Sequence, residues 1–426
     1  MNTTRKVAII GGSRTPFMRS NTAYSHSSNQ ELLTAAIRGL VERFNLQKEQ
    51  LGEVVAGAVI KHTRDFNLTR EATLSSGLSP QTTAYDIQQA CGTGLEATIL
   101  VANKIALGQI EVGIAGGTDT SSDIPIAVNE KFRHLLLDLN RAKSTGDKLK
   151  VLSRFRPGHL APLTPSVQEP RTGLSMGQHC ELMAKHWQIS REDQDDLAWQ
   201  SHQKLKAAYE NNFFSDLITP FNGQYRDGIL RDTPREKLAQ LKPAFDKENG
   251  TLTAANSTNL TDGAATVLLA SEEWASQRGL PVLAYLTFSE MAAVDFYSQA
   301  EQSEGLLMAP AYAVPRMLQR AGLTLQNFDF YEIHEAFAAQ VLCTLQAWQS
   351  PEYCKQRLGL DQPLGEIDRS KLNVNGSSIA TGHPFAATGA RIVATLAKIL
   401  EQSGKGRGLI SICAAGGQGV TAILER

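Results

Sequence analysis

The chain has 426 residues, of which 42% are hydrophobic and 20% are charged, and its formal net charge is −1. This length exceeds what one simple hydrophobic core supports, so we expect two or three lobes in an ordinary globular protein. A net charge so close to zero provides no general attraction to nucleic acid or to anionic membranes, and we expect no nucleic-acid partner.

Strand and helix patterns alternate through the first third of the chain. Short apolar runs predict strands at 7–10, 54–60 and 112–117, and apolar residues at helical spacing predict helices at 30–44 and 95–107. Such alternation is typical of layered α/β structure.

A lone cysteine, Cys91, precedes the second of these helices and is followed by two glycines within three residues. This order predicts a strand, a tight turn and a buried helix, with Cys91 at or near the helix N-terminus. The unpaired N–H groups and the positive dipole end there favour a thiolate over a thiol. A lone cysteine is often only a small buried side chain, so a reactive site needs further support from elsewhere in the chain.

The middle third, from about residue 122 to residue 250, is polar and charged and has no strong strand pattern. Two amphipathic helices are expected within 173–211, separated near Ser190, which together with Asp193 resembles a helix-capping pair. This part of the chain predicts an inserted helical lobe. Strand patterns return at 264–270 and 282–288.

The last hundred residues repeat the order of the first hundred, which indicates a weak internal duplication. A predicted strand at 373–376 leads to Gly-His383-Pro, a helix at 386–400, and a strand at 408–413 that ends before a glycine pair. Duplicated α/β halves bring equivalent turns together at a shared site.

Four reactive side chains lie at these turns and strand ends. His383 is the candidate base for Cys91, because a histidine beside a cysteine can take its proton. Cys413 precedes a glycine-rich turn, and a thiol with an ordinary pKa of about 8.5 suits proton transfer to carbon. His334 begins a His-Glu-Ala-Phe run that lacks the second histidine of a zinc-protease motif. Each residue alone has a structural explanation, but the four together predict an acyl-transfer site.

At these residues the chain resembles the thiolases, which are acetyl-CoA acyltransferases, over essentially its whole length. The resemblance implies a duplicated thiolase fold of class α/β, layered α-β-α-β-α. It implies an N-terminal half (1–121 with 251–275), a loop domain that binds substrate and CoA (122–250), and a C-terminal half (276–426). Several distant motifs carry it: Val7–Phe17, Gln89–Gly94, Ala115–Asp119, Ser175–Gly177, Asn256–Ala265, His334–Phe337, Gly382–Pro384 and Cys413–Gly419.

The resemblance implies a role for each reactive residue. Cys91 is the nucleophile that becomes acylated, His383 is its base, and Cys413 exchanges a proton with the α-carbon of acetyl-CoA. His334 stands where many thiolases have asparagine, and with His383 it is expected to hold the enolate oxygen. The backbone N–H groups of Cys91 and Ala415 are expected to form a second oxyanion hole.

The resemblance also places two residues near the substrate. Thr258 is expected near the pantetheine arm, and Met176 is expected to line the tunnel for it. The implied reaction is a two-step ping-pong thiolysis. It needs no metal and no bound cofactor, since CoA is a substrate.

A basic segment, Glu130–Arg156, has eight Lys or Arg and three Asp or Glu, a net charge of +5, with apolar residues at helical spacing. Such a segment can bind a partner subunit, a membrane surface or the phosphates of CoA, or it can be a solvated helical lobe. It resembles the extra helices of thiolase subunits in trifunctional fatty-acid oxidation complexes, as does His334. This implies a degradative 3-ketoacyl-CoA thiolase of β-oxidation, with a homodimer core and an enoyl-CoA hydratase/3-hydroxyacyl-CoA dehydrogenase partner.

Five cysteines are spread widely, in an odd number and without CxxC spacing, which argues against a disulfide scaffold or a zinc ribbon. The N-terminal apolar run is too short for a signal peptide, and no stretch is long enough to span a bilayer. We therefore expect a cytoplasmic protein with reduced thiols.

Three other functions remain open at this stage. An acetoacetyl-CoA thiolase working in the condensing direction would share every catalytic residue. A ketoacyl synthase is disfavoured, because Cys413 stands where that class uses a histidine. A non-catalytic acyl-CoA carrier is disfavoured by the intact set of four reactive side chains.

Overall fold

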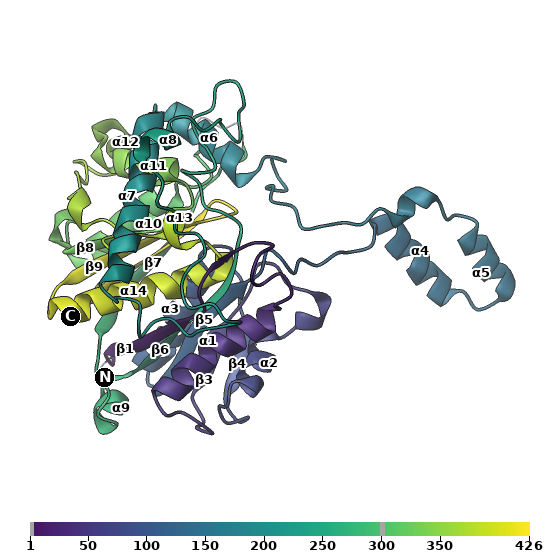
Figure 1. Cartoon of the computed structure of the whole chain (residues 1–426), viewed down its shortest axis with the longest axis horizontal. Helices are drawn as coiled ribbons and strands as arrows, with labels where there is room; N and C mark the ends of the chain where they lie inside the picture. The colour runs from purple at the N-terminus through teal and green to yellow at the C-terminus, as the bar shows by residue number, and fades with distance from the viewer. Residues whose placement is uncertain (1–3, 299–302) are drawn as a thin grey trace.

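The computed structural model describes residues 4–298 and 303–426, and a ten-stranded mixed sheet lies at the centre of this part (Figure 1). The strands are β1 (Val7–Arg14), β2 (Met18–Arg19), β3 (Glu53–Ala56), β4 (Thr83–Asp86), β5 (Val112–Asp119), β6 (Thr261–Ser271), β7 (Ala284–Ala293), β8 (Phe330–Ile333), β9 (Arg407–Ala414) and β10 (Gln418–Glu425). Their order in the sheet is β4-β3-β5-β6-β1-β7-β10-β9-β8, with β2 paired to β6. The predicted strands before residue 290 and at 408–413 are confirmed, with shifts of a few residues at their ends.

The helices are α1 (Asn29–Arg43), α2 (Leu68–Ser75), α3 (Thr93–Ala106), α4 (Glu130–Arg141), α5 (Thr145–Leu152), α6 (Met176–His186), α7 (Arg191–Glu210), α8 (Arg235–Leu238), α9 (Glu272–Gln277), α10 (Ala309–Ala321), α11 (Ala338–Gln349), α12 (Pro351–Gln356), α13 (Ser378–Thr381) and α14 (Thr388–Ser403). Short 3-10 turns lie at Thr63–Asp65, Pro157–Leu160, Leu325–Asn327, Arg369–Lys371 and Phe385–Ala387. Across the described residues, no helix is both long and apolar enough to cross a membrane.

The two halves of the sheet have the same strand arrangement. In the N-terminal half, β3 and β5 are parallel, and β6 and β1 follow antiparallel. In the C-terminal half, β8 and β9 are parallel, and β10 and β7 follow antiparallel. A short pairing of β1 with β7 joins the halves. This correspondence confirms the predicted duplication.

The predicted strand at 373–376 is wrong. Asn373 has a φ of 47° and begins a turn, and only Leu372 forms a single parallel bridge, to Tyr331 of β8. The Asn373 side chain instead accepts from the N–H of Ile333 and donates to its carbonyl, at 2.9 and 3.0 Å. The Asn373 side chain therefore takes the hydrogen bonds of the Ile333 backbone at the edge of β8, where the backbone of a further strand would have paired.

Helices and sheet halves alternate in layers, as the fold class predicts. Along β1, Val7 and Ile9 join one apolar cluster while Ala8 and Ile10 join another, because successive side chains point to opposite faces of a strand. The first cluster contains α3 and α14 and draws on both sheet halves. Helices α1 and α2 cover the outer face of the N-terminal half, whereas α6, α10 and α11 pack over the C-terminal half.

The two central helices touch at a pair of glycines near their N-termini. A Cβ on Gly389 of α14 would lie 2.1 Å from the backbone nitrogen of Leu95, and one on Gly94 of α3 would lie 2.7 Å from the carbonyl oxygen of Ala386. Only glycine permits this approach of two backbones. The contact brings the turn before α3 next to the turn before α14.

Part of the middle third forms an arm that projects from the body, on the right of Figure 1. We define the arm as residues 124–167; it contains α4 and α5, and its stalk is closed by reciprocal backbone hydrogen bonds of 2.8 Å between Ala127 and Leu163. By contrast, α6 and α7 pack against the C-terminal half. The Ser190 side chain accepts from the N–H of Asp193 at the start of α7, which confirms this cap. The predicted domain boundaries remain predictions.

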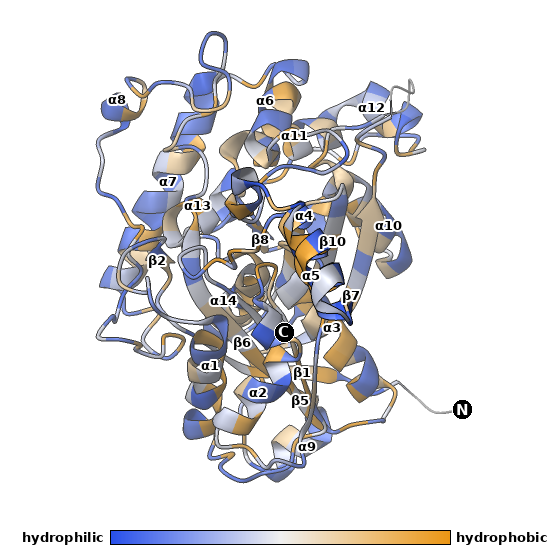
Figure 2. Cartoon of the chain, turned by 90° about the vertical axis from the view of Figure 1, so that its right-hand side faces the viewer, coloured by the Kyte–Doolittle hydropathy of each residue, from blue (hydrophilic) through white to orange (hydrophobic). Residues whose placement is uncertain are grey.

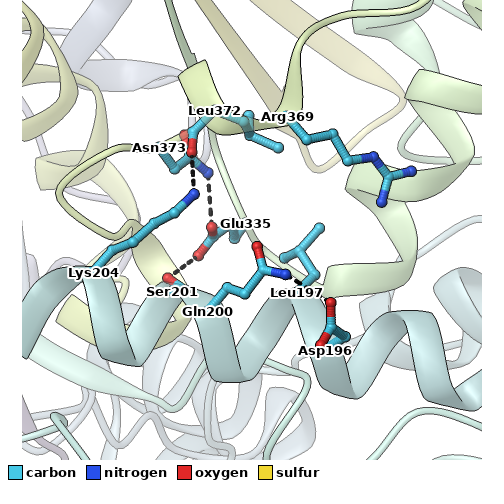
Figure 3. A pocket seen from close by; sticks show the side chains of 9 residues that line it. All are labelled: Asp196, Leu197, Gln200, Ser201, Lys204, Glu335, Arg369, Leu372 and Asn373. Atoms are coloured by element: carbon cyan, nitrogen blue, oxygen red, sulfur yellow. Dashed lines mark hydrogen bonds between the residues drawn. The ribbon is translucent and has the colours of Figure 1, made fainter.

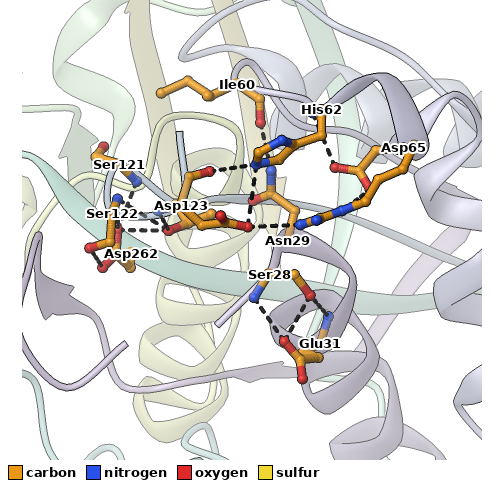
Figure 4. Close-up of polar contacts among 12 residues, drawn as sticks. Ser28, Asn29, Glu31, Ile60, His62, Asp65, Ser121, Ser122, Asp123 and Asp262 are labelled. Atoms are coloured by element: carbon orange, nitrogen blue, oxygen red, sulfur yellow. Dashed lines mark hydrogen bonds and ion pairs between the residues drawn. The ribbon is translucent and has the colours of Figure 1, made fainter. Parts of the chain in front are cut away.

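Both ends of the arm are fastened to the body. At its start, the carbonyl of Asp123 lies 3.0 Å from His62 Nε2 and its carboxylate lies 2.9 Å from Arg64 (Figure 4). At its end, Glu169 Oε1 accepts from the N–H of Gly416, in the turn between β9 and β10, at 2.7 Å. The first anchor belongs to the N-terminal half and the second to the C-terminal half.

We expect Gly389→Ala to lower the free energy of unfolding by about 3 kcal/mol, because a methyl group placed against backbone atoms cannot escape by rotating. Gly158→Ala is the control, since a Cβ there has no neighbour within 4 Å. Urea denaturation of both variants measures the difference. Equal stability of the two would contradict the close helix contact.

Candidate active site

Cys91 lies in the turn between β4 and α3, directly before the N-cap residue Gly92. Ala90 has a φ of 46°, in the left-handed region that residues other than glycine rarely adopt. The turn is held by Thr93, whose hydroxyl accepts from the N–H of Gln89 at 2.8 Å and donates to the carbonyl of Ala90 at 2.7 Å. Cys91 therefore occupies the start of the helix, as the sequence predicts.

His383 lies beside Cys91, although the two are 292 positions apart in the chain. Its Nε2 is 3.1 Å from Cys91 Sγ, and its Nδ1 is 2.6 Å from the hydroxyl of Thr388, the first residue of α14. Its backbone N–H donates to the hydroxyl of Thr261 at 2.9 Å. These contacts fix the position and direction of the imidazole ring.

His334 completes a group of three ligand-type side chains. Its ring centroid lies 4.2 Å from that of His383, and its Nδ1 is 2.7 Å from the hydroxyl of Ser378. Its Nε2 is buried and has no hydrogen-bond partner among the described residues. The donor atoms of Cys91, His334 and His383 all lie within 4.8 Å of one another, and these three side chains are the ones in the described structure that could hold a metal ion.

Cys413 and the turn that follows it also lie beside Cys91. The Cys413 side chain is buried at the end of β9 and interacts electrostatically with Cys91. The backbone N–H groups of Ala415 and of Cys91 itself both interact with the Cys91 thiol. The structure thus brings together four predicted side chains and the two predicted backbone donors.

The two residues expected near the substrate lie close to this group but make structural contacts. The N–H and the hydroxyl of Thr258 both donate to the carbonyl of Ala336, at 3.1 Å. Met176 begins α6 and packs against the apolar cluster that contains Cys413 and Phe337. Their contact with a substrate remains a prediction.

Burial, rather than the helix terminus, dominates the electrostatics of the site. It raises the pKa of the Cys91 thiol to about 12, which outweighs the lowering by the Ala415 N–H. It likewise lowers the pKa of His383 to about 3, with a further lowering by Arg391. Burial therefore opposes the thiolate that the helix terminus is expected to favour, and it favours the neutral form of both the thiol and the imidazole.

Burial favours the neutral form of the second thiol as well. Burial, followed by the influence of Cys91, raises the pKa of Cys413 well above its ordinary value. The ordinary thiol pKa expected for Cys413 from the sequence is therefore wrong, because the side chain is completely buried.

Residues that the sequence analysis missed hold these groups in place. Asp119 is fully buried at the end of β5, and its carboxylate accepts from the N–H groups of Ile60 and Ala386 at 2.8 and 2.9 Å, fixing the turn after His383. Thr388 could have been found from its place at the start of the helix after His383. The contacts of Ser378 and Arg391 leave no comparable signal in the sequence.

A cavity of about 170 Å³ lies behind the His334 segment, between α7 and the 369–373 turn (Figure 3). Glu335 reaches it and accepts from the Ser201 hydroxyl and the Asn373 amide, both at 2.7 Å. These bonds tie the residue after His334 to two other elements of the fold. The residues that line this cavity therefore help to hold the His334 segment in place.

Comparison with known proteins identifies relatives along the whole chain. Residues 7–273 match the family model described as thiolase, N-terminal domain, and residues 288–426 match thiolase, C-terminal domain. The chain is 42% identical over 427 residues to proteins named 3-ketoacyl-CoA thiolase from Yersinia pestis (strain Pestoides F) and Yersinia pseudotuberculosis serotype O:1b (strain IP 31758), covering 99% of this chain and 97% of each relative. The crystal structure of the Bacillus anthracis acetyl-CoA acetyltransferase matches with a TM-score of 0.82 and 31% identity, covering 100% of both chains.

We expect alkylation of Cys91 by iodoacetamide in the resting protein to keep accelerating from about pH 6 to about pH 9, because a raised thiol pKa leaves little thiolate at neutral pH. Mass mapping of the Cys91 peptide at each pH measures the rate. A plateau already reached at pH 6 would instead indicate a preformed thiolate–imidazolium pair.

Proposed function

The chain belongs to the thiolase family of acyltransferases, and we propose that it cleaves 3-ketoacyl-CoA with free CoA, giving acetyl-CoA and a shortened acyl-CoA. The observation that carries the proposal is the 3.1 Å contact between Cys91 and His383, with the thiol of Cys413 near enough to interact with Cys91. A nucleophile with a base in hydrogen-bond reach suits covalent acyl transfer.

The first half-reaction forms an acyl-enzyme. As Cys91 Sγ attacks the 3-keto carbon, its proton passes to His383 Nε2. Transfer during the attack, rather than before it, suits a pair that burial keeps neutral. The developing oxyanion accepts hydrogen bonds from the N–H groups of Cys91 and Ala415. When the oxyanion collapses, the Cα–Cβ bond breaks and its electron pair passes to the departing enolate of acetyl-CoA.

The enolate is then protonated on carbon. His334 and His383 donate hydrogen bonds to its oxygen, which lowers the cost of the negative charge in a buried site. The Cys413 thiol gives its proton to the α-carbon and becomes a thiolate. Acetyl-CoA leaves, and the acyl group remains on Cys91.

The second half-reaction returns the enzyme to its starting state. The Cys413 thiolate takes the proton from the thiol of free CoA, and the CoA sulfur attacks the acyl carbon on Cys91. The departing Cys91 sulfur recovers its proton from His383. Every proton is accounted for by these side chains and CoA, and we propose that the reaction uses no metal and no bound cofactor.

The named relatives support a degradative role in fatty-acid β-oxidation, for which we propose a cytoplasmic enzyme with a homodimer core. The structural match to an acetyl-CoA acetyltransferase favours acetoacetyl-CoA chemistry as the second candidate. Steady-state thiolysis rates across 3-ketoacyl-CoA chain lengths separate the two. Thiolysis of acetoacetyl-CoA alone, with no activity on longer 3-ketoacyl-CoA, would favour the second candidate function.

We expect incubation with a 3-ketoacyl-CoA in the absence of free CoA to leave the shortened acyl group on Cys91, since no acceptor is present to remove it. Peptide mass mapping locates the group, and Cys91→Ser is the control that should stay unmodified. Acylation of Cys413 would reverse the two roles, and no thiolysis by the wild-type protein would contradict the proposed function.

We expect Cys413→Ala to slow proton exchange at the α-carbon of acetyl-CoA by at least about a hundredfold, within the range that general acid–base catalysis supplies. Acylation of Cys91 by a simple thioester should change much less, because that step transfers no proton to carbon. Exchange of deuterium from solvent, followed by mass spectrometry, measures the first rate. Exchange at the wild-type rate would show that another group carries the proton.

We further propose that the arm binds a hydratase/dehydrogenase subunit. Apolar side chains of the arm are unusually exposed, with Leu149 of α5 at 64% and Leu160 of the 3-10 turn after it at 61%. Figure 2 shows apolar residues in orange along α4. Arg154 forms an ion pair of 2.6 Å with Asp138 of α4, so part of the basic charge holds the hairpin together. A partner with an apolar groove and an acidic rim would complement this surface.

We expect the pair Lys148→Glu and Lys150→Glu to weaken co-purification with such a partner while leaving thiolysis of short substrates within about twofold. Arg154 is left unchanged, because its pair with Asp138 holds the two helices together. Pull-down at low and high salt measures binding. Unchanged partner binding with a tenfold higher KM for CoA would show that these lysines bind the phosphates of CoA. If the variant lost binding only to anionic liposomes, the lysines would instead bind a membrane surface.

A further inference from the structure

Arg391 is a buried cation that makes no direct contact with the reacting groups. It lies on α14, only 2% exposed, and one guanidinium nitrogen donates to the hydroxyls of Ser378 at 2.9 Å and Ser377 at 3.3 Å. The Ser378 hydroxyl is in turn 2.7 Å from Nδ1 of His334. A chain of two hydrogen bonds therefore links Arg391 to the histidine beside the nucleophile pair.

The direction of each hydrogen bond in this chain follows from its donors. A guanidinium only donates, so the Ser378 oxygen must accept from Arg391. The Ser378 proton then needs an acceptor, and His334 Nδ1 is the one that the described residues offer it. A neutral imidazole that accepts at Nδ1 carries its proton on Nε2. That Nε2 is the buried atom without a partner, beside His383.

We propose that Arg391, acting through Ser378, is a positioning residue that holds His334 as the neutral tautomer with its proton on Nε2, ready to donate to a substrate oxygen. This inference rests on the proposed function for the identity of that oxygen, which is the enolate oxygen of acetyl-CoA. The tautomer itself is a property of the resting protein.

The charge of Arg391 acts in the same direction. Among the described residues, no carboxylate lies within ion-pair distance of its guanidinium, and Glu332 and Glu335 act on its charge only from farther away. After burial and the influence of His383, Arg391 further lowers the pKa of His334, which keeps the ring neutral. The same charge stabilises a negative enolate formed nearby.

The neighbouring serines provide a matched pair of variants for the test. Both are fully buried at the start of α13 and both accept from Arg391, but only Ser378 contacts His334. Ser378→Ala removes the link to the histidine, whereas Ser377→Ala removes a bond to Arg391 alone. A general effect of losing a buried hydroxyl should appear in both.

The first measurement is the ¹⁵N spectrum of histidine-labelled protein without substrate, with His334→Asn used to assign the signal. We expect wild type to show a protonated Nε2 and an unprotonated, hydrogen-bonded Nδ1 at His334. Ser378→Ala should move the Nδ1 signal towards that of a free acceptor, and Ser377→Ala should leave it unchanged. A proton on Nδ1 in wild type, or equal spectra of the two variants, would overturn the proposal.

The second measurement is thiolysis. We expect Ser378→Ala to lower kcat about tenfold, less than the roughly hundredfold loss of a whole oxyanion-hole donor, with KM nearly unchanged. Ser377→Ala should stay within about twofold of wild type, and Arg391→Lys, which keeps the charge, should lose less than Arg391→Met. A Ser378→Ala variant with the wild-type kcat would overturn the proposal. A wild-type protein that cleaves no 3-ketoacyl-CoA would instead contradict the proposed function, while the spectrum would still report the tautomer.

Discussion

The contact between α3 and α14 is the constraint on which the active site depends. Each helix starts after a turn that carries a reactive side chain, and each packs against strands of both sheet halves, so neither can shift without disturbing the core. Gly94 and Gly389 let the two backbones meet close to those starts. The distance between Cys91 and His383 is thus set by helix packing, and the side chains need little freedom of their own.

Burial favours the neutral form of both partners in this site. A thiol and an imidazole in water would both titrate near physiological pH, but here the low dielectric disfavours the charged form of each. Charge must then arise only during the reaction, at atoms that already face donors. In the proposed mechanism, the N–H groups of Cys91 and Ala415, together with buried Arg391, would supply such stabilisation without solvent reorganisation.

The sequence predicts the fold and the reactive residues better than it predicts their environment. Cys91, His383 and Cys413 stand at turns beside strongly periodic elements, so their approximate places follow from local pattern alone. Arg391 lies in a helix with an apolar stripe, where a basic residue reads as an ordinary solvent-facing one, and its burial depends on elements far away in the chain. The strand expected at 373–376 fails for a similar reason, because Asn373 bonds to a strand forty residues earlier.

The arm is fastened at Asp123 and at Glu169, and neither anchor includes a residue of the stretch between them. The entropy of closing a loop rises only slowly with its length, so the stretch between two fixed ends can grow, shrink or change its surface at small cost to stability. Mutations in the arm lie between the two anchors, which separate them from the part of the chain that holds Cys91. The arm is therefore a region in which new binding partners can evolve while selection on the chemistry continues unchanged, and the two properties can diverge independently among descendants of one enzyme.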